Sequence, residues 1–204
     1  MNTRNDSACN IIGSINRKEE QYETRRRQLL DIGLRHFVQY GYYGTSTRKI
    51  AQEAGISSGL MFHYYPNKLA LYEALVEIGC NVMLTESEEE YPPLVFFEKQ
   101  LEWYLSIAMS DSFASRMFVF MGMASINAKD ISESAYEHIK KHDVEAISIP
   151  YIEKGQKEGV IRDGDPRTLA TVFYSSIQGF AEILNTKPDI KLPEKDWFMA
   201  ILKK

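Results

Sequence analysis

The chain of 204 residues has only two cysteines, Cys9 and Cys80, and they form no Cys-x-x-Cys pair. Two isolated cysteines give neither a disulfide framework nor a zinc-binding pattern, so we expect free thiols in a reducing compartment. The sequence also lacks an apolar run of the roughly 18 residues that a membrane span needs. Residues 1–14 do not combine a basic start with an apolar stretch, as a signal peptide would. These absences predict a cytoplasmic protein without a membrane partner.

Motifs of catalysis are missing as well. The chain has no glycine-rich phosphate loop, no Ser/His/Asp set and no close carboxylate pair in a catalytic context. His138 and His142 have the i, i+4 spacing of a zinc site. Their segment is polar almost throughout and carries lysines beside both imidazoles, which favours a solvated helix face. We therefore expect no catalytic residue, no metal and no cofactor, and hence no enzyme.

Apolar residues make up 44% of the chain, enough for a buried core. The net charge of -4 is divided unequally along the sequence. Residues 1–72 hold 10 Lys and Arg against 6 Asp and Glu, whereas residues 73–204 hold 14 against 22. A basic front and an acidic back are typical of a head that meets phosphate and a body that does not.

Nearly every segment after residue 22 has helical periodicity, so the predicted fold class is all-α. Residues 1–22 are polar and predict a flexible tail. Residues 23–72 predict a three-helix DNA-binding head, and residues 73–204 predict a second helical domain, whose role in regulation, ligand binding and dimerisation is implied by a family resemblance of the segment 41–68. A glutamate run with two prolines, 86–93, predicts a linker.

Two short helices separated by a glycine turn indicate a helix-turn-helix in the head. The hydroxyl cluster 45–47 is expected to cap the first of them, Gly55 to end it in a left-handed conformation, and Ser57 or Ser58 to cap the second. A longer helix before them is expected to end at Gly41. The inner stripe of that longer helix is predicted to be Leu29, Leu30, Ile32, Gly33, Phe37 and Tyr40.

The body predicts helices over 95–109, 113–127 and 132–154, followed by a helix that starts at Asp165-Pro166. Apolar positions in this last helix cover an arc of roughly 200°, about twice the width that a one-sided surface helix needs. A second subunit is the economical cover, and the segment 196–202 would add a further interface helix. The predicted dimer residues are Phe173, Ile177, Phe180, Leu184, Trp197 and Ile201.

The segment 41–68 closely resembles the tetracycline-repressor (TetR-type) transcription factors. The residues that match the family pattern are Gly41-Tyr42, Thr45-Ser46, Ile50-Ala51, Ala54-Gly55-Ile56-Ser57, Gly59, Tyr64-Tyr65 and Lys68. The resemblance implies a ligand-responsive regulator, most often a repressor, that binds its operator as a homodimer. The family usually has Tyr at the position of Phe62, where the hydroxyl often reaches a phosphate. Here His63 or Tyr64 would have to supply that contact.

Only the first turn of so short a recognition helix can meet base edges. Ser57 and Ser58 would donate hydrogen bonds there, although Ser57 can also be no more than a cap. Arg48 would reach a phosphate or a guanine edge. By resemblance Lys68 binds phosphate, with a free surface lysine as the alternative; the basic run 25–27 is either a phosphate contact or a solvated face. The predicted DNA-binding set is Thr45, Thr47, Arg48, Ser57, Ser58, Gly59, Leu60, Phe62, His63, Tyr64 and Lys68.

Aromatic and methionine side chains are dense in the body. Ligand pockets are apolar with a few polar anchors, but any helical body also needs such residues as core. The existence of a pocket is therefore implied by the family resemblance and not by composition. The candidates for contact with an apolar or planar inducer are Trp103, Tyr104, Phe118, Met121, Asn127, Tyr174 and Gln178.

Together these features predict a homodimeric, ligand-responsive transcriptional regulator, a repressor, on a palindromic double-stranded operator. One alternative is a small-molecule binding protein or enzyme with a vestigial DNA-binding head. Another is a regulator without an inducer, controlled by dimerisation or by a protein partner.

Overall fold

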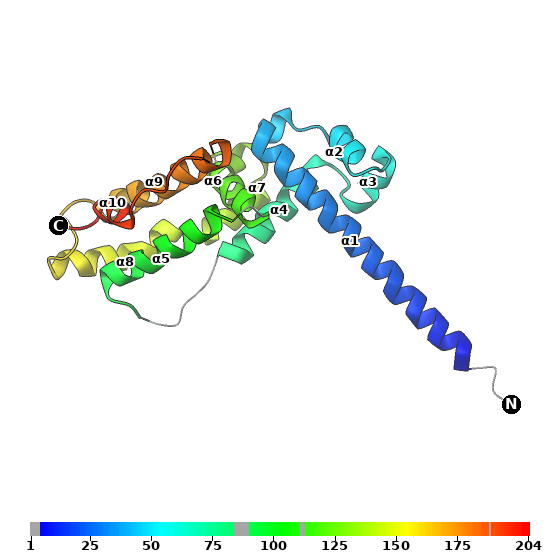
Figure 1. Cartoon of the computed structure of the whole chain (residues 1–204), viewed down its shortest axis with the longest axis horizontal. Coiled ribbons are helices and arrows are strands. Elements are labelled where there is room, and N and C mark those ends of the chain that lie inside the picture. Colours follow the sequence, from blue (N-terminus) through cyan, green and yellow to red (C-terminus); the bar gives the residue numbers. More distant parts are fainter. Residues whose placement is uncertain (1–4, 84–89, 111–112, 188) are drawn as a thin grey trace. The chain divides into compact units, whose positions relative to one another are not determined.

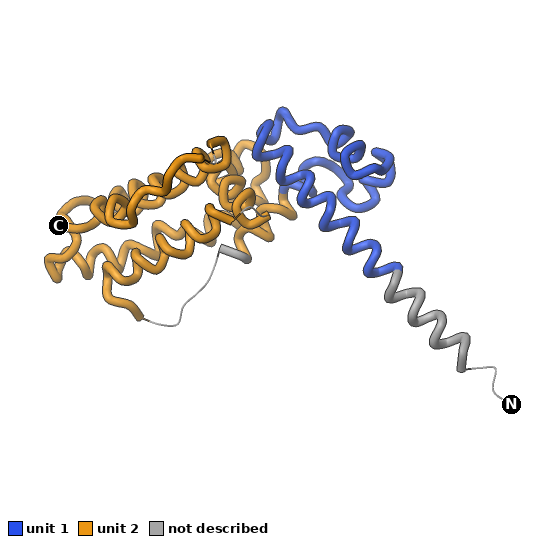
Figure 2. Tube along the Cα trace, in the orientation of Figure 1, with its two compact units in different colours: residues 1–72 blue, residues 73–204 orange. Residues whose placement is uncertain are grey.

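The computed structural model describes residues 5–83, 90–110, 113–187 and 189–204, with side chains from residue 18 onward except those of 82 and 83. Within these ranges all regular structure is helical, in ten helices (Figure 1). One isolated bridge joins Ile161 to Lys203. The predicted all-α class is therefore confirmed. The chain divides into two compact units, residues 1–72 and 73–204 (Figure 2).

The first unit contains α1 (Asn5–Gly44), α2 (Thr47–Glu53), α3 (Ser58–Tyr64) and the first residues of α4 (Lys68–Met83). Helix α1 thus begins within the segment for which the sequence predicts a tail. Its regular geometry stops where predicted, because Gly41 has φ 67° and ψ 177°. The core of the unit consists of fully buried apolar side chains from all four helices, among them Leu29, Leu34, Phe37, Ile50, Met61 and Leu71.

One member of the predicted inner stripe of α1 lies outside the core. Tyr40 is 48% exposed and its ring lies 5.6 Å from that of His36. The preceding positions Phe37 and Ile32 are buried as predicted. Tyr40 comes directly before the break at Gly41, at the edge of the packed face, so its prediction as a core residue was wrong.

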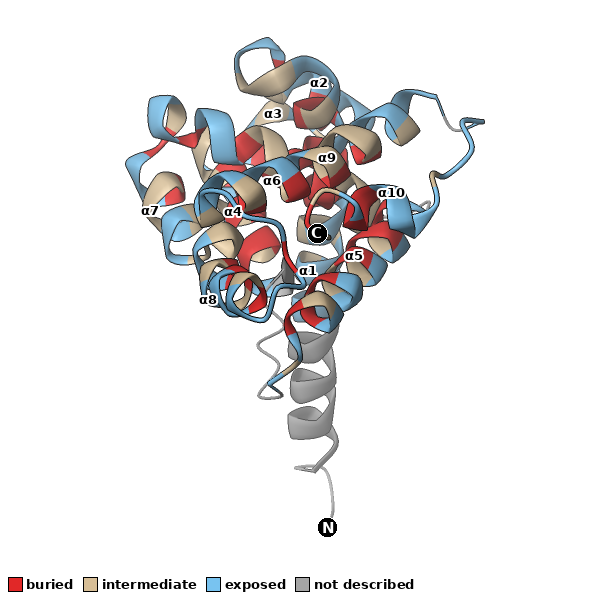
Figure 3. Ribbon diagram, turned by 90° about the vertical axis from the view of Figure 1, so that its left-hand side faces the viewer, coloured by how far each residue is buried: buried red, intermediate tan, exposed pale blue. Residues whose placement is uncertain are grey.

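The second unit contains α5 (Pro93–Ala108), α6 (Phe113–Ile131), α7 (Glu133–Lys141), α8 (Val144–Lys157), α9 (Pro166–Thr186) and α10 (Lys195–Met199). Helix α9 packs against α5, α6 and α8, and buried residues line the facing sides of these helices (Figure 3). The ring of Phe173 on α9 lies 5.2 Å from that of Phe97 on α5. Aromatic packing of this kind forms the core of the unit. Half of the predicted linker 86–93, residues 86–89, lies outside the described residues.

The single helix predicted over 132–154 is two helices. Ser132 accepts a hydrogen bond from the amide of Ala135 at 3.2 Å and begins α7. Asp143 accepts from the amide of Ala146 at 3.0 Å and begins α8. Serine and aspartate are strong N-caps, so Asp143 starts a new helix where apolar periodicity alone indicated a continuous one.

Other predicted helix ends are confirmed. Asp165 accepts from the amide of Thr168 at 2.8 Å and Pro166 occupies the first turn of α9. Gly159, which follows the end of α8, has φ 74°. Local capping chemistry therefore fixes both ends of the loop between α8 and α9.

Helix α4 continues from the first unit into the second. Glu73 accepts a hydrogen bond from the Ser132 hydroxyl at 2.5 Å. Gly79 packs so closely on α6 that an added Cβ would lie 2.2 Å from the sulfur of Met121 and 3.1 Å from that of Met117. The second half of α4 is therefore fixed to α6 and to the start of α7.

Candidate nucleic-acid interface

The turn between α2 and α3 depends on Gly55. This residue has φ 68°, a left-handed conformation that costs a residue with a side chain roughly 1–2 kcal/mol. The amide of Ile56 donates to the carbonyl of Ala51 at 3.0 Å and so closes the end of α2. Gly55 therefore sets the angle at which the chain enters α3, as the sequence predicted.

Helix α3 begins with a cap and an exposed first turn. The hydroxyl of Ser57 accepts from the amide of Leu60 at 3.1 Å, so the capping role is confirmed. Met61 is fully buried and anchors the helix. Leu60 and Phe62 are each 43% exposed. The space beside Gly59 is open, because a Cβ added there would approach the Ser57 hydroxyl oxygen only to 4.0 Å. One face of α3 is thus held in the core while the other is open to a ligand.

Phe62 and His63 are exposed, while Tyr64 is half-buried. The ring of Tyr64 lies 4.8 Å from that of Tyr22 of α1 in a tilted arrangement, and His63 lies edge-on to the same ring at 6.0 Å. This contact was not predictable from the sequence, because Tyr22 belongs to the segment predicted as a tail. The end of α3 is therefore supported by α1.

Helix α2 presents a different arrangement from the predicted one. Its N-cap is Ser46, whose side chain makes no capping bond. Thr45 is buried, and its hydroxyl donates toward the carbonyl oxygens of His36 at 3.0 Å and Gly41 at 2.7 Å. Thr45 thus joins the loop to α1 inside the unit, which corrects its assignment to the DNA-binding surface. Arg48, in the first turn of α2, is exposed.

Lys68 makes hydrogen bonds within the protein itself. Its ammonium donates to the carbonyl oxygens of Tyr42 at 2.7 Å and Thr45 at 3.1 Å and lies 4.5 Å from the centre of the Tyr42 ring. Burial lowers the pKa of this ammonium below its ordinary value. An ammonium has three donors, so two hold the loop between α1 and α2 and one remains for a phosphate.

This geometry gives Lys68→Ala two separable effects. Two carbonyls lose a charged donor, so we expect the free energy of unfolding to fall by about 1–2 kcal/mol. Loss of one phosphate contact would also reduce the salt slope of DNA binding by about 1. Urea unfolding and salt-dependent anisotropy measure the two effects. Lys157→Ala, on an exposed residue of α8, is the control; equal stability of the two variants would contradict the role in the loop.

The basic run 25–27 divides into different environments. Arg25 donates to the carbonyl of Ala54 at 3.0 Å and so caps the end of α2. Arg26 lies over the ring of Tyr65 at 5.6 Å and 3.8 Å from a carboxylate oxygen of Glu23. Arg27 is exposed. The first two arginines therefore support the fold of the head, and Arg27 has the most freedom to reach a phosphate.

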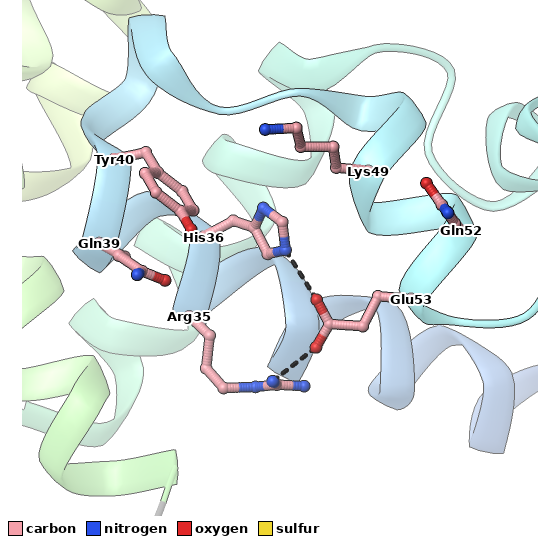
Figure 4. Close-up of a pocket in the computed structure, with 7 residues that line it drawn as sticks. All are labelled: Arg35, His36, Gln39, Tyr40, Lys49, Gln52 and Glu53. Carbon is pink, nitrogen blue, oxygen red and sulfur yellow. Dashed lines mark hydrogen bonds and ion pairs between the residues drawn. The ribbon is translucent and has the colours of Figure 1, made fainter.

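An ion-pair cluster joins α1 to α2 (Figure 4). Glu53 accepts from Arg35 at 2.6 Å and from Nε2 of His36 at 2.8 Å. The hydrogen bond from His36 is the main cause that lowers the pKa of Glu53 below its ordinary value of 4.5; burial opposes it, and Arg35 adds to it. This cluster fixes the end of α2 against α1.

A lowered pKa of Glu53 stabilises the fold above the ordinary value of 4.5, and this contribution is lost as the pH falls through the lower folded-state value. Because the carboxylate is 40% exposed, we expect less than about 1 kcal/mol from it. In urea unfolding, the stability difference between wild type and Glu53→Gln should be full near pH 6 and should shrink below about pH 4.5. Glu153→Gln, on an exposed glutamate of α8, should show no such trend. A constant difference for Glu53→Gln down to pH 3 would disprove the linkage.

The predicted ligand residues of the second unit are brought together only in part. The ring of Tyr104 lies 5.2 Å from Phe118 and 5.9 Å from Tyr174. Trp103 lies 4.9 Å from Tyr104. Gln178 approaches Gly122 so closely that an added Cβ there would lie 2.0 Å from its amide nitrogen.

Two other members of the set lie elsewhere. Met121 packs on Gly79 of α4. Asn127 is exposed and donates to the carbonyl of Met123 at 3.1 Å, so its prediction as an anchor beside the other side chains was wrong. The hydroxyl of Tyr174 instead meets the fully buried Ser148 at 2.7 Å, a partner that sequence reasoning missed. Burial raises the pKa of the Tyr174 phenol.

The predicted dimer residues also separate into two groups. Phe173 and Ile177 are 0% and 1% exposed within the single chain, which leaves no surface for a partner and corrects that assignment. Phe180 is half-buried beside Phe198 at 6.1 Å, and Leu184 and Ile201 are half-buried as well. Trp197 is 67% exposed. The exposed apolar residues of α9 are Val172 and Ile183, on the face opposite the buried one.

No group of three or more His, Cys, Asp and Glu side chains in the described part of the chain could hold a metal ion. His142 uses Nδ1 in a hydrogen bond with the carbonyl of His138 at 2.6 Å. Among the helices whose residues the structure describes, none is long and apolar enough to cross a membrane.

Comparison with known proteins agrees with this geometry. Residues 29–75 match the family described as "Bacterial regulatory proteins, tetR family". The HTH-type transcriptional regulator RutR of Escherichia coli strain K12 is 24% identical over 174 residues, which cover 84% of this chain and 80% of RutR. The HTH-type transcriptional repressor Rv1474c of Mycobacterium tuberculosis is 42% identical over 72 residues, 35% of this chain and 38% of that protein.

A solved structure has the same fold. The crystal structure of AibR in complex with isovaleryl coenzyme A and operator DNA superposes with a TM-score of 0.66 at 18% identity, covering 86% of this chain and 94% of AibR. Residues 29–75 are therefore a DNA-binding domain of the TetR type, and most of the chain is similar to a TetR-type regulator. These comparisons support a DNA-binding transcriptional regulator with a helix-turn-helix rather than an enzyme.

Proposed function

We propose that this regulator represses transcription by binding a near-palindromic operator as a homodimer, with α3 of each subunit in a major groove. The observation that carries the proposal is the exposed first turn of α3. Ser57, Gly59 and Leu60 lie on the open side of a helix that Met61 anchors in the core. Exposed Arg48 opens the neighbouring helix. A helix N-terminus favours negative charge, so the starts of α2 and α3 both suit DNA.

The proposed dimer uses the outer face of α9. At about 100° per residue, Val172, Ser176, Gly179 and Ile183 share one face, and both apolar members are exposed. An added Cβ at Gly179 would meet nothing within 4 Å. Small residues between two exposed aliphatic ones allow a second α9 to approach closely, which supports a two-fold contact. Two recognition helices related by such an axis require half-sites about 34 Å apart or a multiple of that distance.

We also propose that a small apolar or planar molecule controls DNA binding from the second unit. The hydroxyls of Tyr174 and Ser148 meet within an aromatic cluster that includes Tyr104 and Phe118. Few polar groups among aromatic walls are what ligand sites offer. The AibR structure, which holds both a coenzyme A thioester and operator DNA, supports the view that this fold can serve both partners.

Helix α4 is the proposed connection between ligand and DNA. Its first residue, Lys68, holds the loop before α2, and its later residues Glu73 and Gly79 contact the start of α7 and the side of α6. A ligand that favours one position of α6 would bias α4. It can change operator affinity only by its differential affinity for the two states, typically about 1–3 kcal/mol.

Short duplexes that tile the region around the protein's own gene test the proposal by fluorescence anisotropy. We expect one duplex to bind at least about 1000-fold more tightly than the others at 150 mM salt, with a footprint that has two-fold symmetry. Equal binding to every duplex would reject operator recognition.

Screening a panel of apolar and planar metabolites for release of that duplex tests the ligand proposal. A compound that releases the wild type should release Tyr174→Phe at least several-fold less well, because the phenol contact with Ser148 is lost. An equal response of the variant would place the ligand elsewhere.

A further inference from the structure

A groove on the DNA-binding head has no role in the function described so far. It lies between α1 and α2, has a volume of about 550 Å³, and is lined by the cluster of Arg35, His36 and Glu53 and by Lys49 (Figure 4). We call it the α1–α2 groove. Its volume falls in the range of small-molecule sites.

Some charged side chains of the α1–α2 groove form ion pairs, and one does not. Glu53 is neutralised by Arg35 at 2.6 Å and His36 at 2.8 Å. Lys49, by contrast, has no carboxylate within ion-pair distance among the described residues, and its ammonium lies 6.0 Å from the centre of the Tyr40 ring. The groove therefore keeps one uncompensated cation after its internal ion pairs are formed.

A second observation points to a missing ligand. Nδ1 of His36 is buried and has no hydrogen-bond partner within the part of the chain that the structure describes. His36 itself is only 8% exposed and lines the groove. Figure 4 shows this nitrogen on the side of the ring away from Glu53, facing the side where Lys49 lies. A buried polar atom without a partner is costly, and a bound group that pairs with it removes that cost.

The protonation of His36 determines what this nitrogen can bind. An ionised carboxylate only accepts hydrogen bonds, so Nε2 must donate to Glu53. Nδ1 is then a lone pair in the neutral ring and a second donor in the imidazolium. The charged or titratable groups beside the ring are Arg35 and Tyr40 from α1 and Lys49 and Glu53 from α2.

We propose that the α1–α2 groove binds a small oxyanion, a carboxylate or a phosphate, between the Lys49 ammonium and the imidazolium of His36. Both groups flank the Tyr40 ring, at 6.0 Å and 5.6 Å. The side-chain amides of Gln39 and Gln52 also line the groove and supply further donors.

The test uses the full chain with acetate and inorganic phosphate, titrated at constant ionic strength with chloride and followed by amide chemical shifts in NMR. We expect saturable shifts confined to residues 35–40 and 49–53, with a dissociation constant on the order of millimolar. Lys49→Met should weaken binding about tenfold, because a charged hydrogen bond is lost.

The neighbouring residue provides the control that separates this groove from the DNA-binding surface. Arg48→Ala should leave acetate and phosphate binding at the groove unchanged, whereas Lys49→Met should leave the salt slope of operator binding unchanged. Unsaturable shifts, shifts centred on α3, equal affinity in Lys49→Met, or a changed salt slope in that variant would each overturn the proposal.

Discussion

Arg48→Ala is expected to weaken operator binding by roughly 5- to 150-fold, the largest effect of any single truncation in the head. Arg48 is exposed in the first turn of α2, where a guanidinium can pair with a guanine edge or a phosphate. A bidentate contact with guanine contributes about 1–3 kcal/mol of discrimination. Anisotropy with the operator at several salt concentrations measures both the affinity and its salt slope.

Base substitution in the operator distinguishes the two contacts available to Arg48. If Arg48 reads a base, the variant should lose preference at one position of each half-site. If it binds phosphate, affinity should fall equally for all sequences and the salt slope should decrease by about 0.9. Gln52→Ala, one turn further along α2 on the groove side, serves as the control. Wild-type affinity in Arg48→Ala would remove α2 from the interface.

Gly179→Arg is expected to convert the protein to a monomer and to reduce operator affinity by about 10²- to 10⁴-fold, because the gain from binding two linked half-sites is lost. The single chain gives no reason for such an effect. A side chain at Gly179 would meet nothing within 4 Å, and in a helix interior most residues are more favourable than glycine by up to about 1 kcal/mol. A loss of association would therefore report a second subunit.

Sedimentation velocity and thermal unfolding separate association from folding in this variant. Compared with the wild type in the same state of association, Gly179→Arg should have an equal or higher melting temperature. Its sedimentation coefficient should fall to that of one chain. Asn185→Arg, exposed on α9 but away from the face of Val172, is the matched control. A Gly179→Arg protein that remains dimeric would exclude this face of α9 as the contact.

Helix positions in this protein were predictable because their ends are set by local chemistry. Gly55, Ser57 and the Asp165-Pro166 pair each act through bonds to residues three or four positions away, so sequence alone was sufficient. Asp143 acts in the same way, but the apolar periodicity through it indicated one helix. Asp143, taken as a helix N-cap, would have predicted the break between α7 and α8.

The arrangement of side chains between helices was less predictable. The contacts of Thr45 with α1 and of Lys68 with the Tyr42 and Thr45 carbonyls join residues that are distant in sequence. Their motif positions suggested DNA contact for both, and a motif does not distinguish a residue that touches DNA from one that positions its neighbours. In α9 the broad apolar arc correctly indicated extensive burial, but Phe173 belongs to the core of its own chain.

The mass of the protein bound to its own promoter duplex, measured by sedimentation with a fluorescently labelled DNA, tests paired recognition by α3 most directly. Two copies per duplex, or a multiple of two, are predicted, with binding lost when either half-site is scrambled. One copy per duplex at saturating concentration, with full affinity for an isolated half-site, would contradict it.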